Sequence, residues 1–128
     1  MKTDKETSLK PLFWVGNCLG DLRAFPDDVK DSIGFALHEA QMGGKSRKAK
    51  PFKGYKGSGV LEVVDRYDGD TYRAVYTVRF KGAVFALHAF QKKAKKGIAT
   101  PKPELDMIKR RLRAAEEKYT ALQKERKL

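Results

Sequence analysis

Apolar and polar positions in the first third of the chain predict a short strand followed by a helix. Residues 11–15 contain Phe, Trp and Val in succession, which is typical of a strand, and the glycine-containing stretch 16–20 indicates a turn. From Asp27 onward, apolar residues recur at steps of three and four, with Pro26 before them and two glycines after them at 43–44. This spacing predicts an amphipathic helix.

Three strand-like runs follow, over residues 60–67, 71–80 and 83–90. Their connectors are short and contain glycine, so the runs predict a meander of antiparallel hairpins. Alternation along the middle run places Arg73 and Arg79 on the same face of the sheet. The last run is apolar on both faces, which favours an interior strand, and His88 is its one polar residue.

The last part of the chain predicts a long helix. We expect Thr100 to be its N-cap, Pro101 to take the first helical position and Glu104 to lie in the early turns. Apolar positions then follow a three-four spacing at Leu105, Ile108, Leu112, Ala115, Tyr119 and Leu122. This stripe is expected to pack on the sheet, whereas the outer faces of the helix are basic.

Composition places these elements in one soluble unit. With 128 residues and 41% hydrophobic residues, the chain is long enough for one core. We expect a flexible N-terminus over 1–10, a single domain over 11–122 and a tail over 123–128. The lone Cys18 excludes an internal disulfide, and the apolar segment 12–15 is too short to span a bilayer. A reducing cytoplasm is the expected location, with no membrane association.

Charge indicates the kind of partner. The formal net charge is +12, which favours nucleic acid, and after it an acidic protein or an anionic membrane surface. Residues 43–59 contain no acid, and aromatic residues alternate with six cations: Lys45, Arg47, Lys48, Lys50, Lys53 and Lys56. A second basic cluster follows the last strand at Lys92, Lys93, Lys95 and Lys96. Each segment is either a solvated loop or a surface for phosphates.

The sequence lacks the motifs of several common classes of enzyme. The chain contains no P-loop, no zinc-protease helix and no serine-nucleophile elbow, and two histidines are too few for a multi-histidine metal centre. We therefore expect no metal and no cofactor. Cationic side chains on a sheet face can promote cleavage of RNA by its own 2′-hydroxyl. Alternatively, Arg73 and Arg79 are plain surface residues and His88 is a hydrogen-bonded core residue.

Three segments together resemble a known family. They are FALHEAQMGGKSRKAKPFKGYKGSGVLEV, YRAVYTVRFKGAVFALHAFQKKAKKG and TPKPELDMIKRRL, and they resemble the phage-derived, HigB-like branch of the RelE/ParE toxin superfamily. The resemblance runs from about residue 12 to residue 119. It implies an α+β fold with N-terminal helices, a small twisted antiparallel sheet and a long C-terminal helix.

The resemblance also implies a function and site residues. Toxins of this kind cut mRNA on translating ribosomes and are neutralised by a cognate antitoxin, commonly a helix-turn-helix protein. Arg73 matches the arginine that contacts the scissile phosphate, and Lys92 and Lys93 match the basic position that stabilises the transition state or the leaving group. Lys95 and Lys96 extend this patch. His88 completes the expected catalytic group, and the basic loop with Arg79 is expected to bind RNA.

The chain departs from the RelE pattern at the proton-transfer position. Residues 61–64 stand where RelE has paired lysines, and no tyrosine follows the lysine cluster before Tyr119. The candidates that remain are His88, Glu62 and Tyr67. Two other functions stay open: ParE-like inhibition of DNA gyrase without catalysis, and a plain RNA-binding module.

Overall fold

The sheet and its helices account for most of the chain. The computed structural model describes residues 9–92 and 100–128. Its elements are β1 (Leu12–Trp14), α2 (Cys18–Arg23), α3 (Asp27–Gln41), β2 (Ala49–Pro51), β3 (Val60–Tyr67), β4 (Asp70–Thr77), β5 (Val84–Lys92) and α4 (Lys102–Lys124). The five strands form one mixed sheet in the order β1-β5-β4-β3-β2.

The predicted meander is confirmed. Strand β3 pairs with β4, and β4 with β5, both antiparallel. Asp68 and Gly69 connect β3 to β4 with φ values of 52° and 85°, and this pair of positive φ angles is the geometry that closes a two-residue hairpin. The turn fixes the register, because Tyr67 lies opposite Asp70 and every later pair follows from it.

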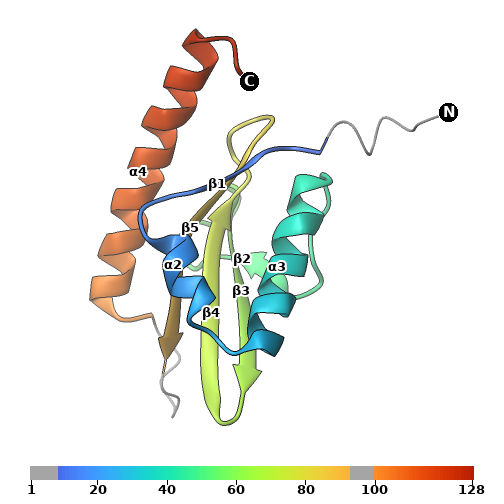
Figure 1. Ribbon diagram of the computed structural model, residues 1–128. Helices are drawn as coiled ribbons and strands as arrows, with labels where there is room; N and C mark the ends of the chain where they lie inside the picture. Colours follow the sequence, from blue (N-terminus) through green and yellow to red (C-terminus); the bar gives the residue numbers. More distant parts are fainter. Residues whose placement is uncertain (1–8, 93–99) are drawn as a thin grey trace, which may run out of the picture.

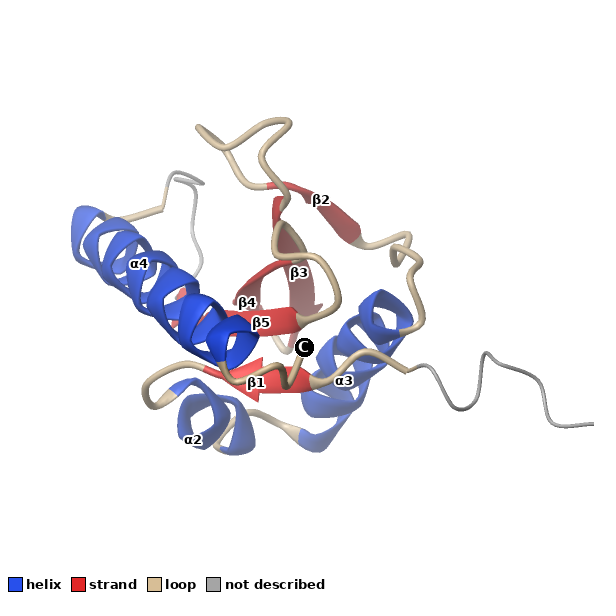
Figure 2. Ribbon diagram, turned by 90° about the horizontal axis from the view of Figure 1, so that it is seen from above, coloured by secondary structure: helices blue, strands red, loops and turns tan. Residues whose placement is uncertain are grey.

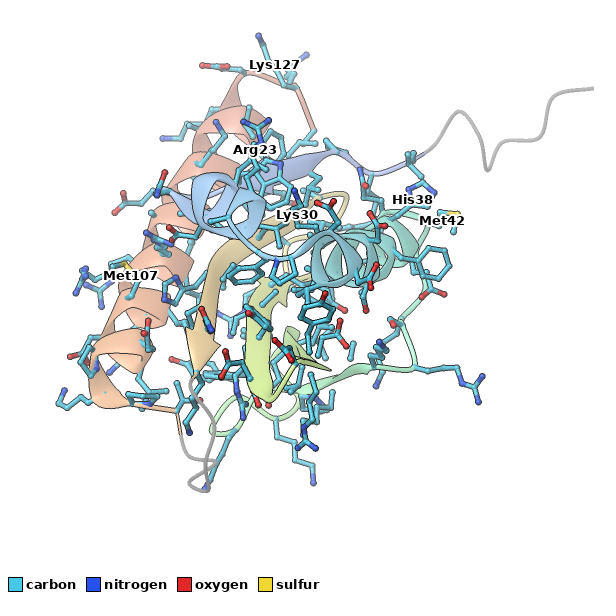
Figure 3. The ribbon with its side chains drawn as sticks, turned by 60° about the horizontal axis from the view of Figure 1, so that its bottom comes forward. Arg23, Lys30, His38, Met42, Met107 and Lys127 are labelled. Carbon is cyan, nitrogen blue, oxygen red and sulfur yellow. The ribbon has the colours of Figure 1, made fainter. Side chains whose placement is uncertain are left out.

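Two layers of helices cover the sheet (Figures 1 and 2). On one face, α2 and α3 pack on a core that includes Ile33, Leu37 and Tyr76. On the other face, α4 packs mainly against β5 through Ile108 and Leu112. Figure 3 shows the labelled side chains of Met42, which follows α3, and Met107 on α4 at opposite sides of the molecule. The described helices leave open the part of the α4 face formed by β3 and the first half of β4, since α4 packs mainly against β5.

Local sequence patterns did not predict two short elements, although the family resemblance implied more than one N-terminal helix. Helix α2 occupies part of the stretch interpreted as a turn, where Cys18 and Leu22 bury one side of it. Strand β2 lies within the predicted basic loop and pairs antiparallel with β3, with Ala49 in the core. The lysine and proline of β2 are typical of an edge strand, which natural sheets keep short and polar.

Two predicted boundaries were wrong. Strand β4 ends at Thr77, because the Thr77 hydroxyl donates to the Gly59 carbonyl (2.8 Å) and accepts from the Arg79 N–H (3.1 Å). Arg79 therefore lies beyond the strand. Helix α4 begins at Lys102 with Pro101 at the N-cap, because the Pro101 carbonyl already accepts from helical N–H groups, so Thr100 is not the cap.

Strand β1 has an unexpected partner. The strand predicted at 11–15 is confirmed, but it pairs in parallel with Val84–Ala86 of β5 and so makes the sheet mixed. Strand β5 is interior, as predicted. A bulge at Leu87 interrupts its alternation, since Val75 faces His88 while Tyr76 faces Ala86. The bulge brings Leu87 and His88 together toward α4.

Candidate nucleic-acid interface

Strand register gathers charged side chains on the face that α4 leaves open. Residues that pair across antiparallel strands project to the same face. Lys50 on β2 pairs with Glu62 on β3, and Val64 on β3 pairs with Arg73 on β4. Alternation along β3 sends Glu62, Val64 and Arg66 to one side. The sheet thus places Lys50, Glu62, Arg66 and Arg73 together.

Arg73 lies at the floor of this surface. Its side chain is only 10% exposed, and its Nη1 donates to Glu62 Oε1 at 3.1 Å. Its Nε–H is buried and has no hydrogen-bond partner among the described residues. A buried guanidinium donor without a partner is costly, so the site is suited to an incoming acceptor such as a phosphate oxygen.

A cavity opens above this ion pair. Its volume is ≈ 390 Å³, and it is lined by Lys50, Phe52, Lys53, Glu62, Val64, Arg66, Arg73 and Thr100. Four cationic side chains thus face one carboxylate. We call this space the anion cavity. An excess of positive charge in a partly enclosed space concentrates anions, and the planar guanidinium fits phosphate geometry.

Lys92 of β5 lies on the same face of the sheet as Arg73, although it does not line the anion cavity. Phe90 pairs with Arg73, and Lys92 pairs with Thr71, so Arg73 and Lys92 stand in diagonal positions on one face. Residues on such a diagonal are about 7–8 Å apart at Cα. The other predicted members of the lysine cluster, Lys93, Lys95 and Lys96, lie outside the described residues.

His88 is held by α4. Its Nε2 lies 2.5 Å from Glu104 Oε1, and its Nδ1 lies 3.1 Å from Nη1 of Arg111. Because a guanidinium only donates, Nδ1 must be the acceptor, and Nε2 carries the proton that Glu104 accepts. Arg111 also bonds the Leu87 carbonyl at 3.0 Å. Both ring nitrogens are therefore engaged, and His88 ties β5 to α4 instead of lining the anion cavity.

The predicted basic loop divides into two groups. Lys50 and Lys53 line the anion cavity. Lys48 points to the opposite side, where its Nζ bonds Ser32 and Asp65 at 2.9 and 3.2 Å. The other three cations of the loop are exposed and do not line the cavity: Lys45, Arg47 and Lys56.

Arg79 does not belong to the cavity. The side-chain Nε of Arg79 donates to the Ser58 carbonyl at 2.9 Å, and its backbone packs closely on Gly59, where an added Cβ would lie 2.9 Å from the Arg79 Cβ. The expectation that Arg79 shares a sheet face with Arg73 was wrong, because the strand ends before it.

Arg66 was missed as a site residue, although a signal was present. It lies four residues after Glu62 in β3, so the same alternation that defines the buried face also sends Arg66 to the cavity side. Phe52, by contrast, was expected to be a loop residue that separates the cations and could stack on a base. It is 2% exposed and forms a wall of the cavity.

The described part of the chain gives little support for a reactive thiol or a metal site. Burial raises the pKa of the Cys18 thiol to about 12, so the sulfur stays protonated near neutral pH. Among residues 9–92 and 100–128, no group of three or more potential ligands is placed to hold a metal ion. None of the helices described is both long and apolar enough to cross a bilayer.

Comparisons with known proteins give one match. A family model described as "Phage derived protein Gp49-like" matches residues 20–113, which include most of α2, all of α3, strands β2 to β5 and the first half of α4. Searches of curated proteins and of solved structures found no match.

Proposed function

Because the chain belongs to the Gp49-like family of phage-derived proteins, a toxin-like family of the RelE/ParE kind, we propose that it is a toxin that cleaves mRNA without a metal ion. The observation that carries the proposal is Arg73, almost buried at the floor of a cavity with three further cations on its walls. From the resemblance of its sequence we also propose that the chain belongs to the HigB-like branch and that its targets are mRNAs on translating ribosomes.

The cavity supplies the groups that a metal-free cleavage needs. Arg73 binds the non-bridging oxygens of the scissile phosphate and stabilises the charge that develops on them. Glu62, 3.1 Å from Arg73, is the carboxylate closest to that phosphate among the residues lining the cavity. It accepts the proton of the 2′-hydroxyl, whose oxygen then attacks phosphorus.

The second half of the reaction needs an acid. As the bond from phosphorus to the 5′-oxygen breaks, that oxygen takes a proton from an ammonium group, which leaves a 2′,3′-cyclic phosphate and a 5′-hydroxyl. Lys92 stands on the diagonal from Arg73 and is proposed for this step, together with Lys93. Lys50, Lys53 and Arg66 hold the flanking phosphates.

A toxin-like family implies an antitoxin partner. We propose a helix-turn-helix antitoxin, which must either close the anion cavity or block access to the ribosome. The described structure contains both an open cationic face and a separate, acid-rich helix α3 with Phe35 64% exposed.

Mapping of RNA 5′ ends tests the proposed function. Brief induction of the protein should produce new 5′-hydroxyl ends within coding regions within minutes, and growth should stop. RNA that stays intact while DNA supercoiling fails would replace this proposal by gyrase inhibition. Intact RNA together with normal growth would leave only a binding module.

Salt dependence tests the assignment of the basic loop. Each phosphate contact to single-stranded RNA contributes about 0.7 to the slope of log affinity against log salt. Lys50→Ala and Lys53→Ala should each reduce the slope by about this amount, because both residues line the anion cavity. Lys48→Ala and Lys56→Ala are matched controls from the same loop. Equal slopes for all four variants would contradict the assignment.

A further inference from the structure

A second cavity adjoins the anion cavity. Its volume is ≈ 290 Å³, and it is lined by Phe52, Lys53, Thr100 and Leu105. The first three of these residues also line the anion cavity, and only Leu105 is added. The two spaces are therefore neighbours that share a wall, one of them strongly cationic and the other mostly apolar.

Leu105 is the unusual member of this wall. It belongs to the stripe of α4 that faces the sheet, one turn before Ile108 and two turns before Leu112. Those two residues are 0% and 9% exposed, whereas Leu105 is 39% exposed. The helix thus directs a large apolar side chain toward a part of the sheet that offers no core to receive it. An apolar side chain left open in a cavity often marks a binding site.

Phe52 makes the opposite wall rigid. Its N–H donates to the Val60 carbonyl at 2.9 Å, and its ring packs beside Tyr55 with centroids 5.6 Å apart. The ring itself is 2% exposed and belongs to the core below α4. The cavity wall thus combines the edge of a fixed aromatic side chain with the more exposed Leu105, and such apolar surface suits the flat face of an aromatic ring.

We propose that this second cavity, which we call the base pocket, holds one nucleobase of the RNA whose phosphate is bound at Arg73. The inference rests on the proposed function and extends it. A nucleotide is a flat ring joined to a phosphate, and the two cavities present an apolar slot joined to a cationic one. The shared residues Phe52, Lys53 and Thr100 would lie between base and phosphate.

The base pocket would add position-dependent affinity. Stacking of one base on a protein side chain contributes about tenfold or more to affinity. The charged walls of the anion cavity read only the backbone, so they bind every sequence alike. A slot of limited size that takes one base is the part of the site able to favour some cleavage positions over others.

The test uses a short RNA that binds but is not cut. One 2′-O-methyl group at the mapped cleavage position blocks the attacking hydroxyl, and abasic nucleotides are placed one at a time on either side. Fluorescence anisotropy with the full chain should show one position at which loss of the base weakens binding about tenfold or more, with small effects elsewhere. Leu105→Gln should bind the parent RNA about as weakly as wild type binds that abasic RNA, and should no longer distinguish the two.

Controls separate the two levels of the proposal. Leu122→Ala removes a leucine from the same helix away from both cavities and should bind like wild type, and Leu105→Ala should behave like Leu105→Gln.

Binding that is weakened by Arg73→Lys but does not depend on any single base would overturn the base pocket alone. Cleavage of unmodified RNA at the wild-type rate by Arg73→Lys would overturn the proposed function. Free nucleoside monophosphates that bind as tightly as the RNA would overturn RNA as the source of the base.

Discussion

Arg73→Lys lowers the rate of RNA cleavage about 100-fold or more and removes growth arrest, while the protein stays folded. The expectation follows from geometry more than from charge. Lysine keeps the positive charge but replaces a planar set of donors by a single ammonium group, and the lost donors include the buried Nε–H, which has no partner in the described part of the chain. A transition state with charge on two phosphate oxygens then loses donors aimed at it.

Arg79→Lys is the matched control for this variant. It is the same substitution six residues later, at an arginine that bonds the Ser58 carbonyl outside the anion cavity. Cleavage of a defined RNA by purified protein gives the rate, and thermal unfolding reports the fold. Wild-type cleavage by Arg73→Lys would remove Arg73 from the proposed chemistry, and equal losses in both variants would indicate a general structural effect.

Arg73→Ala is the less informative substitution. Arg73 and Glu62 have side chains only 10% and 9% exposed, so removal of the arginine leaves a carboxylate in a poorly solvated place. Breaking a buried pair on one side costs about 3–5 kcal/mol, which is a large part of the stability of a domain of this size. Loss of activity in Arg73→Ala would therefore mix unfolding with loss of the site.

Elements that bury a regular stripe could be predicted from the sequence. Helix α3 follows its three-four spacing between Pro26 and Met42, and the β3–β5 meander follows from alternation and glycine turns. Both patterns arise because one face of the helix or strand is buried, and the order of apolar and polar residues along that element shows this directly. The elements α2 and β2 have six and three residues, fewer than two periods of a helix or strand, so no stripe could identify them.

The candidate site could be predicted only in part, because it depends on contacts between distant segments. Alternation and the tight turn at Asp68–Gly69 suffice to put Glu62, Arg66 and Arg73 on one face. The addition of Lys50 needs the pairing of β2 with β3, which places it beside Glu62 and which no local pattern specifies. The same holds for His88, whose role is set by Glu104 and Arg111 of a helix that follows it in the chain.

Opposite faces of the sheet explain why neighbouring lysines differ. Ala49 is buried against the α3 side of the sheet, and Lys50 pairs with Glu62 on the other side. Lys48, one residue earlier, turns to Asp65 and Ser32. A uniform basic loop in the sequence is thus divided by one short strand into a part that faces the cavity and a part that does not. Charge density alone therefore does not distinguish the cations that line the anion cavity from those that do not.

Glu62→Gln should separate catalysis from binding. The amide keeps the shape of the side chain and can still accept the hydrogen bond from Arg73, but it cannot take the proton of a 2′-hydroxyl. We expect the single-turnover rate of cleavage to fall about 100-fold or more, in the range for loss of a general base. RNA affinity should stay equal or rise, because Glu62 is the one acidic residue among the described residues that line the anion cavity.

The opposite signs of these two effects make the prediction specific. Asp65→Asn is the matched control, since it neutralises an acid on the same strand whose partner Lys48 lies on the other face. A purely structural Glu62 would lose cleavage, RNA binding and thermal stability together, because all three would follow from a disturbed Arg73. A rate that falls while binding is retained requires that the carboxylate itself act on the bound RNA. Cleavage at the wild-type rate would assign the proton to another group and leave Glu62 only the task of orienting Arg73.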